Sequence, residues 1–538
     1  MRRTTLVLIA ALAAGTAALW NPSFQATPPE LTQAMQHAQT AADRGIVTFA
    51  FGDWDALSTD TLRVSASPWK LTNAALALQQ ADGNAEDAAA ADIGQIYRQF
   101  GFNVPETFAN WPDGMPQPAI TTPVGLNVGT GSALLPPISA TISNIGCAAC
   151  HSSVVYDAQG QPDLTQVWLG TPNGSINLEA YTQTLFTAVR DYGQDADVLM
   201  DTTLALYPDT TLREQITLRR FILPELQNTI TERDAEFGRL LPFRASLAGA
   251  TNGLDSLQNR LNLLPEGEVL TESIFNSVPD LGGRLWRTKL LNSGTYALPG
   301  IDHTDTLTAT DITPEHRAGH AGIIAYFTVP AMGVTQEVAQ SNISDALDIT
   351  AWMEVYAPQP YPGTIDASLA AMGGAIYARD CASCHGTYDG SQLTSFPNVE
   401  ADIGTDPQRA RLLTQTIADA VNGGTFGRYI TARTVTTYTA PPLTGVWSSG
   451  PYLHNGAVPT VWHLLTPDER PETFEVGGHR QDLSRLGVDL APPADYVQWS
   501  TPARVDTAAF GLSNGGHTFG QSLSDAEKWA LIEFLKTL

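Results

Sequence analysis

Two copies of a Cys-x-x-Cys-His motif, at 147–151 and 381–385, constrain this chain more than any other feature. They contain all four cysteines of the sequence. In this pattern two thiols three positions apart can form thioethers with the two vinyl groups of one porphyrin, while the adjacent histidine reaches the iron. The sequence therefore predicts two covalently bound haem c groups. The predicted attachment and iron-ligand residues are Cys147, Cys150 and His151 for one group, and Cys381, Cys384 and His385 for the other.

Paired cysteines of this spacing also occur in zinc sites and in disulfide redox centres. A zinc ribbon usually places its two cysteine pairs about 15–20 residues apart. Cys147 and Cys381, in contrast, are 234 positions apart, and a histidine follows both pairs. We therefore favour haem attachment over these two alternatives.

The first twenty residues have the layout of a secretory signal. Arg2 and Arg3 precede an uncharged, mostly apolar run from Leu6 to Leu19, and small residues near its end permit cleavage. An uncleaved anchor stays open as an alternative, because the run approaches the lower limit of a spanning helix, about 17 residues. We expect a signal peptide over 1–20, a periplasmic or secreted mature chain, and no membrane span after signal removal.

The chain is strongly acidic, with a formal net charge of −26. Phosphate binding needs clustered Lys and Arg, so this charge argues against nucleic acid as a partner. An acidic surface can dock a basic electron-transfer protein, although solubility alone also accounts for it. Charged residues make up 16% of the chain, against about 25% in typical domains. This composition fits a folded protein that buries large apolar cofactors.

The composition of the chain and its helix-breaking prolines divide the 538 residues into two expected haem domains. Residues 27–356 are expected to form an N-terminal haem domain with extensions, mostly helix and loop, with helical stretches such as 75–80 and 88–100. Three prolines within 357–363 cannot continue a helix and predict a linker. Residues 364–538 are expected to form a C-terminal cytochrome c domain. The expected fold is therefore mainly α, with two cytochrome c-type haem domains, extensive loops and an N-terminal elaboration.

The C-terminal domain shows the helix pattern of a small c-type cytochrome. Apolar residues recur at helical spacing over 365–380, directly before the second motif. The segment 524–527 is a capping box, and it opens a terminal helix with one apolar face. The pair Gly373-Gly374 would let these two helices approach closely. An insertion at 464–512, rich in Pro and Asp, has no role that the sequence reveals.

The distal ligand of the second iron is expected to be a histidine. All seven methionines lie at or before Met372, so none follows the second motif. His517 is favoured because Gly515-Gly516 lets the backbone come close to a porphyrin face. A haem held on both faces can only pass electrons, and two imidazoles give a lower potential than a His/Met pair. The other candidates are His454, His463 and His479.

The first haem lacks an evident distal ligand. After His151 there is no histidine until His303 and no methionine until Met200. An iron with a free position can bind dioxygen or peroxide. We therefore expect an open or weakly ligated distal face at the first haem.

Four side chains between the motifs are candidates for supporting roles. Tyr156 is near enough in sequence to offer an oxygen ligand, although such a tyrosine is more often packed. His316 and His320 could share a helix face as ligands or proton donors, or lie in a solvated helix start. Trp286 is a candidate bridging aromatic between the two haems, with core packing as the alternative.

Three further segments, 443–447, 451–460 and 531–536, resemble the bacterial di-haem cytochrome c peroxidase superfamily, and most closely its rubber oxygenase branch. The resemblance implies that the motif at 147–151 holds a reactive haem. It also implies that the motif at 381–385 holds an electron-transfer haem with His517 as its distal ligand. The peroxidases place a distal histidine shortly after the first motif, and this chain lacks it there.

We therefore expect an extracytoplasmic di-haem c-type cytochrome oxidoreductase of peroxidase- or oxygenase-like type. The first haem would activate peroxide or dioxygen, and the second would transfer electrons to or from small electron-transfer proteins. One alternative is a non-catalytic di-haem electron carrier. Another is an enzyme that oxidises a partner protein, similar to the di-haem enzyme that matures the tryptophan-derived cofactor of methylamine dehydrogenase. The choice between peroxide and dioxygen, and the substrate, stay open.

Overall fold

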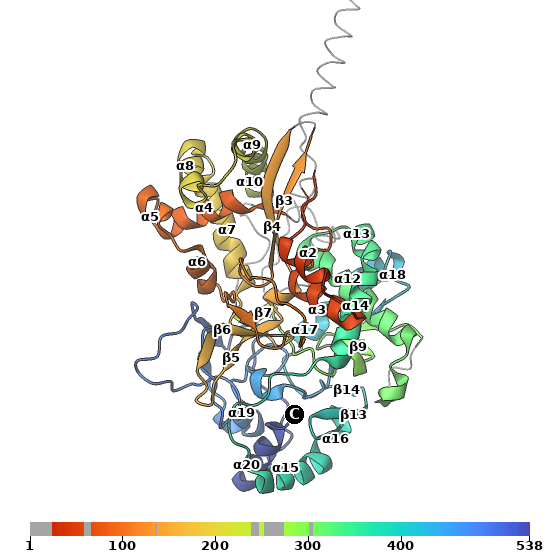
Figure 1. The fold of residues 1–538 in the computed structure, drawn as a ribbon. Helices are drawn as coiled ribbons and strands as arrows, with labels where there is room; N and C mark the ends of the chain where they lie inside the picture. Colours follow the sequence, from red (N-terminus) through yellow and green to blue (C-terminus); the bar gives the residue numbers. More distant parts are fainter. Residues whose placement is uncertain (1–23, 59–65, 135–136, 238–246, 252–273, 301–304) are drawn as a thin grey trace, which may run out of the picture.

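The computed structural model describes residues 24–58, 66–134, 137–237, 247–251, 274–300 and 305–538. It combines helices with sheets of two or three strands, which Figure 1 shows distributed along the chain. The predicted signal peptide at 1–20 lies outside the described residues. Among the residues that are described, no helix is long and apolar enough to cross a membrane.

A buried helix, α4 (Trp69–Gln80), is the centre of the N-terminal unit. Its residues from Trp69 to Leu78 are all buried, as expected of a helix that is surrounded by a core. The expected helix at 75–80 is confirmed as the second half of α4. The elements around it are α5 (Ala85–Ala89), α6 (Ile93–Gln99), β3 (Leu126–Ala133), β4 (Ile138–Ile145), α7 (Leu178–Tyr192), α8 (Ala196–Leu206), α9 (Leu212–Thr217) and α10 (Leu223–Phe237).

The stretch 88–100, expected as one helix, is divided between α5 and α6. Asp92 interrupts it, because its side chain accepts a hydrogen bond from the backbone N–H of Gln95 at 3.2 Å. Such a bond satisfies one of the free donors at a helix start, so it favours a new N-terminus over continuation. The helical character was predicted correctly, and the break was missed.

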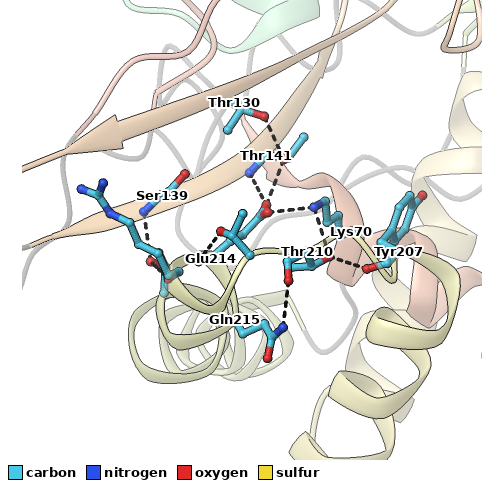
Figure 2. Close-up of polar contacts among 11 residues, drawn as sticks. Lys70, Thr130, Ser139, Thr141, Tyr207, Thr210, Glu214 and Gln215 are labelled. Atoms are coloured by element: carbon cyan, nitrogen blue, oxygen red, sulfur yellow. Dashed lines mark hydrogen bonds and ion pairs between the residues drawn. The ribbon is translucent and has the colours of Figure 1, made fainter.

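A buried ion pair ties α4 to α9 and to the β3–β4 hairpin. Lys70 Nζ donates to Glu214 Oε2 at 2.7 Å and to Thr210 Oγ1 at 3.1 Å. The second carboxylate oxygen of Glu214 accepts from the backbone N–H and the hydroxyl of Thr141, both at 2.9 Å. Figure 2 shows that these side chains, drawn from three elements, converge on one carboxylate. The polar groups around this ion pair therefore compensate part of its desolvation.

Lys70→Met is expected to destabilise the protein strongly, because it leaves the Glu214 carboxylate buried without its cation. Breaking a buried pair costs about 3–5 kcal/mol, whereas the half-exposed pair Arg317–Glu354 should cost about 0–1 kcal/mol when Arg317→Gln breaks it. Thermal and urea unfolding measure the difference. The double variant Lys70→Met/Glu214→Leu should recover most of the loss; equal destabilisation of the single and double variants would contradict this account.

Three helices build a second layer beside the first motif. They are α3 (Ala41–Phe51), α12 (Pro314–Met332) and α14 (Ile343–Val355), and they share one apolar core. Thr40 and Asp43 form a capping box at the start of α3. Arg44 joins α3 to α14 through two hydrogen bonds of 2.8 Å to the carboxylate of Asp348. Figure 1 shows α2, α3, α12 and α14 gathered on one side of the molecule.

Antiparallel strands occur where the sequence was expected to give helix and loop. β3 pairs with β4 over eight residues, and β5 (Ser152–Tyr156) pairs with β6 (Pro162–Leu169) directly after the first motif. Two sheets have the strand orders β1-β4-β3 and β2-β6-β5. These strands alternate only weakly between buried and exposed positions, so their period-2 signal was easily missed.

The C-terminal unit confirms the expected helix pair. α15 (Ala367–Asp380) leads into the second motif on α16 (Ala382–His385), and α20 (Asp525–Leu535) begins at the predicted capping box of Ser524 and Glu527. A Cβ atom at Gly373 would lie 1.8 Å from the carbonyl oxygen of Ala530. The glycine therefore permits the close contact of α15 and α20, as predicted.

The segment 357–363 contains no helix, as its prolines predict. The Trp168 indole donates to the carbonyl of Ala357 at 3.0 Å, and the Trp447 indole donates to that of Gln359 at 2.7 Å. The segment is thus anchored to both halves of the chain. Its role as an interdomain linker stays a prediction.

The insertion at 464–512 packs against the N-terminal half. It contains the hairpin β17 (Thr473–Val476) and β18 (Ala503–Asp506). The Gln481 N–H donates to Gly160 O at 3.0 Å, and Gly478 N–H donates to Ser175 Oγ at 2.9 Å. The insertion therefore holds the β5–β6 hairpin and the loop after it in place through hydrogen bonds. Only the structure reveals this role.

The remaining elements are short and connect these units. The helices are α2 (Pro29–Met35), α13 (Gln336–Ser341), α17 (Gln408–Arg411), α18 (Gln415–Gly423) and α19 (Val461–Leu465). The strands are β1 (Ser67–Pro68), β2 (Thr107–Phe108), β7 (Ala250–Thr251), β8 (Asn276–Ser277), β9 (Lys289–Leu290), β10 (Tyr296–Ala297), β11 (Leu307–Thr308), β12 (Thr387–Asp389), β13 (Gln392–Phe396), β14 (Glu400–Ala401), β15 (Thr431–Ala432) and β16 (Tyr438–Thr439).

Candidate haem-binding sites

The first motif forms a single 3₁₀ turn, Cys147–Ala149, between β4 and β5. Asn173 holds this turn through three contacts. Its backbone N–H donates to Cys150 O at 2.8 Å, and its amide group donates to Ala149 O at 3.0 Å and to Gly101 O at 2.9 Å. The turn is thus fixed by backbone acceptors, which leaves the cysteine and histidine side chains to other partners.

His151 has its ring orientation set by a proline carbonyl. Its Nδ1 lies 3.1 Å from the carbonyl oxygen of Pro279, 128 residues further along the chain. A carbonyl can only accept, so Nδ1 carries the proton and Nε2 presents its lone pair. Burial lowers the pKa of His151 to about 4, which keeps the ring neutral. A neutral imidazole with a free Nε2 is the form that ligates iron.

His385 has the same arrangement in the second motif. Its Nδ1 lies 2.8 Å from the carbonyl oxygen of Pro441, and burial lowers its pKa. Tyr377 on α15 donates its hydroxyl to Gly386 O at 2.9 Å and so fixes the end of the motif. Two histidines 234 positions apart are therefore prepared in the same way for metal ligation at Nε2.

The structure places His517 opposite His385. The two ring centres are 6.2 Å apart, with the ring planes at 58°. Two metal–imidazole bonds of about 2 Å, with about 1 Å from each nitrogen to its ring centre, add up to about 6 Å. The spacing of these two rings would therefore suit one iron atom held by both histidines.

The loop that carries His517 is held by hydrogen bonds to its backbone. Arg470 donates to Gly516 O at 2.8 Å and to His517 O at 3.3 Å, and the His517 N–H donates to Ile403 O at 2.8 Å. A Cβ atom at Gly516 would lie 2.3 Å from the backbone nitrogen of Thr405. Gly516 thus permits a close contact between two loops, a different reason from the expected approach to a porphyrin face.

The three alternative histidines have other partners. His454 stacks on Tyr438 with 4.2 Å between ring centres. His463 Nδ1 lies 2.7 Å from the hydroxyl of Thr460, and His479 Nδ1 accepts from Gly477 N–H at 3.2 Å. Among the described residues, only His517 is brought face to face with His385.

A loop at 279–287 connects the surroundings of the two motifs. It begins at Pro279, which accepts from His151, and its Gly283 packs directly against Pro442, the neighbour of the proline that accepts from His385. Trp286 lies on this loop, in the 3₁₀ turn Arg284–Trp286, and its carbonyl accepts from Asn398 at 3.1 Å. Trp286 thus belongs to a loop that contacts residues beside both motifs. Its role as a bridging aromatic between the two haems stays a proposal.

His316 and His320 lie on one face of α12, as the sequence suggested, and hold this loop. The Nε2 atoms of His316 and His320 lie 2.5 Å from Leu285 O and 3.0 Å from Arg287 O respectively. Burial, with His316 as a second cause, lowers the pKa of His320 to about 3. Both rings thus contact backbone carbonyls of the loop, so their role in the structure is to hold this loop in place.

Tyr156 is a packed side chain in the structure. It lies 4% exposed at the end of β5, and burial raises its pKa to about 12. Its hydroxyl interacts with Gln481 and Ser153. These contacts match the packed alternative for this tyrosine.

A buried polar group beside His151 was missed by the sequence analysis. Tyr356 donates its hydroxyl to Asp280 Oδ2 at 3.1 Å and lies 3.3 Å from the hydroxyl of Thr171. Burial raises the pKa of Asp280 to about 7. Asp280 adjoins the proline that orients His151, so this group supports the axial histidine from behind. No local pattern marks these residues, which come from three distant segments.

The zinc and disulfide alternatives find no support in the structure. All four cysteines are free. Within the described ranges, no three His, Cys, Asp or Glu side chains gather where they could hold a metal ion. The paired motifs with single axial histidines fit haem attachment instead.

Comparison with known proteins agrees with this assignment. A family described as RoxA-like, cytochrome c-like matches residues 437–475, which include the proline that orients His385. The match implies covalently bound haem c and a haem-containing redox function for this part of the chain. It supports the rubber oxygenase-like resemblance and leaves the wider peroxidase superfamily as an expectation.

Two proteins of Sinorhizobium fredii (strain NBRC 101917 / NGR234) are similar to parts of the chain. They are called uncharacterized protein y4iJ and uncharacterized protein y4iM, and each is 31% identical over about a third of this chain, 33% and 34% respectively. The matched parts make up 40% and 51% of those proteins. The chain thus spans about half, or less, of the length of these relatives.

His517→Ala is expected to open the distal face of the second haem. Its ferric signal should change from low-spin to high-spin, and the reduced protein should bind one additional carbon monoxide. His517→Met should keep six-coordinate iron and raise the midpoint potential, because a thioether ligand favours the reduced state. Electron paramagnetic resonance and spectroelectrochemistry measure these changes. The exposed His37 provides the control His37→Ala; an unaltered spectrum for His517→Ala would refute the ligand assignment.

Proposed function

We propose that this chain is an extracytoplasmic di-haem c-type oxidoreductase. Cys147, Cys150 and His151 would hold a haem that supplies the chemistry for activating dioxygen or peroxide. Cys381, Cys384 and His385, together with His517, would hold a haem that supplies electron exchange with the first site or with small electron-transfer proteins. Haem itself supplies the one-electron and oxygen chemistry.

The single observation that carries this proposal is the difference between the two axial histidines. His385 faces His517 at 6.2 Å. Each remaining buried histidine of the described residues has a separate partner: Leu285 O, Arg287 O, Tyr438, Thr460 or Gly477. Within the described residues, no second imidazole ring is placed opposite His151 as His517 is placed opposite His385. A free position for an oxygen species is therefore supported at the first iron and not at the second.

The protein's own residues have defined tasks in this scheme. The Pro279 carbonyl holds the proton on His151 Nδ1, and the Pro441 carbonyl does the same for His385. The neutral rings keep both Nε2 atoms available over the physiological pH range. The loop at 279–287, with Trp286 on it, provides a short covalent and van der Waals connection between the two sites.

The remaining expectations belong to the same proposal. The chain is arranged as two cytochrome c-type haem domains, 27–356 and 364–538, in a mainly α fold with an N-terminal elaboration. It is exported, on the evidence of the sequence at 1–20, and works in the periplasm or outside the cell. Its acidity, with a net charge of −26, favours basic proteins over nucleic acid as partners.

Mass spectrometry of the exported chain should show two porphyrin additions, and electron paramagnetic resonance should show one high-spin or mixed-spin haem beside one low-spin haem. Carbon monoxide should bind one haem per chain after reduction. Fewer than two porphyrins would refute the di-haem assignment. Two low-spin haems that bind no carbon monoxide would instead establish the alternative, a non-catalytic electron carrier.

His151→Ala is expected to abolish turnover, because the first iron loses its protein ligand, while the low-spin signal of the second haem is kept. Oxygen uptake with polyisoprene or other unsaturated compounds tests the oxygenase reaction. Hydrogen peroxide with a reduced small cytochrome tests the peroxidase reaction. His37→Ala serves as the control and should retain full activity. Turnover that persists in His151→Ala would place the reaction away from the first haem.

A further inference from the structure

Arg284 and Arg287 are cations that the protein encloses between the two motifs without a carboxylate partner. Arg287 is 2% exposed, and its hydrogen bonds run from Nη2 to Leu291 O at 2.8 Å and to the hydroxyl of Thr439. Arg284 Nε donates to the backbone oxygen of Asp280 at 2.6 Å, and its Nη1 is buried without a hydrogen-bond partner. In the described part of the chain, neither guanidinium forms an ion pair.

Two buried lysines of this protein do have carboxylate partners. Lys70 pairs with Glu214 at 2.7 Å and Lys289 with Glu400 at 3.1 Å. A buried charge without a partner costs several kcal/mol, so proteins rarely enclose one. Arg284 and Arg287 therefore indicate an anionic group that belongs beside them.

Asp280 is the acidic side chain that interacts electrostatically with Arg284, but its carboxylate forms no hydrogen bond with the guanidinium. The carboxylate of Asp280 accepts from Gly282 N–H at 2.7 Å and from the Tyr356 hydroxyl at 3.1 Å. Arg284 contacts the backbone oxygen of Asp280 and not its carboxylate. The Nη1 atom of this guanidinium thus lacks a hydrogen-bond acceptor.

Arg284 lies between the two haem motifs. It interacts electrostatically with the His151 ring and with Tyr388, which follows the second motif by three residues. Arg287 shares the loop with it and contacts Thr439, two residues before the proline that orients His385. Any anion bound here would be close to both haem peptides.

We propose that Arg284 and Arg287, on the loop that contacts residues beside both motifs, bind the propionate carboxylates of the covalently attached haems. The inference rests on the proposed function, since it requires the haems. Thioether attachment uses only the vinyl groups of a porphyrin, so its two propionates remain as carboxylates. A guanidinium matches a carboxylate with two parallel N–H donors, which gives a strong and directed pair.

The two arginines act as positioning residues in this arrangement. Each fixes a haem carboxylate and cancels part of its negative field at the iron. Removing the cation leaves that field uncompensated, which favours the ferric over the ferrous state. The midpoint potential of the affected haem should therefore fall.

The test uses Arg284→Gln and Arg287→Gln in the exported, haem-loaded chain. Spectroelectrochemical titration from pH 5 to 9 should show the reduction equilibrium of at least one haem weakened about tenfold, which is about 59 mV for a one-electron couple. The potential should also gain a pH dependence, because a carboxylate without its cation takes up a proton more readily. Arg480→Gln is the matched control, since that partly buried arginine already pairs with Asp489 at 2.9 Å, and it should leave both potentials unchanged.

A second variant keeps the proposal testable if Arg284→Gln fails to fold. Arg284→Lys retains the charge and loses the forked geometry, so resonance Raman bands of the haem propionates should shift while the potential changes little. Unchanged potentials in the Gln variants, or unchanged propionate bands in Arg284→Lys, would overturn the proposal. A chloride-dependent potential in the wild type that Arg284→Gln abolishes would also overturn it, in favour of a bound halide. The number of porphyrins found by mass spectrometry separates these outcomes from failure of the proposed function.

Discussion

Two hydrogen bonds from imidazole to proline carbonyls are the contacts on which the candidate sites depend. His151 donates to Pro279 and His385 donates to Pro441, at 3.1 and 2.8 Å. Each bond selects one tautomer and points Nε2 away from the protein backbone. Without them the rings could rotate, and the cysteine pairs alone would not place an axial ligand. The surrounding structure serves to keep these two prolines in position.

The loop at 279–287 shows how this support is arranged. It starts at the carbonyl that orients His151 and packs against Pro442, which follows the proline that orients His385. His316 and His320 hold its backbone from α12, and their burial keeps their rings neutral. One short segment therefore couples both sites mechanically. It also carries Trp286 and the two enclosed arginines, so its position bears on electron transfer as well as on ligand geometry.

Local features of the fold were predictable because they depend on neighbouring residues. The helix before the second motif, the capping box at Ser524 and the close contact at Gly373 follow from periodicity, side-chain chemistry and the lack of a Cβ atom. The β3–β4 and β5–β6 hairpins were missed, since their pairing partners, not their own patterns, stabilise them. The docking of the insertion at 464–512 depends on backbone hydrogen bonds to residues about 300 positions earlier, which no local pattern encodes.

The sequence by itself predicted the covalent chemistry from six residues in two motifs, and it offered histidines but no methionines after the second motif. It could name His517 as the favoured ligand because ligand identity depends on residue type. Only the tertiary structure decided that His517 faces His385 while His454, His463 and His479 bind elsewhere. It alone brought Asp280, Tyr356 and the arginines of the loop together. Ligation and charge pairing act over a few ångströms in space, and folding creates those distances between residues that are far apart in the chain.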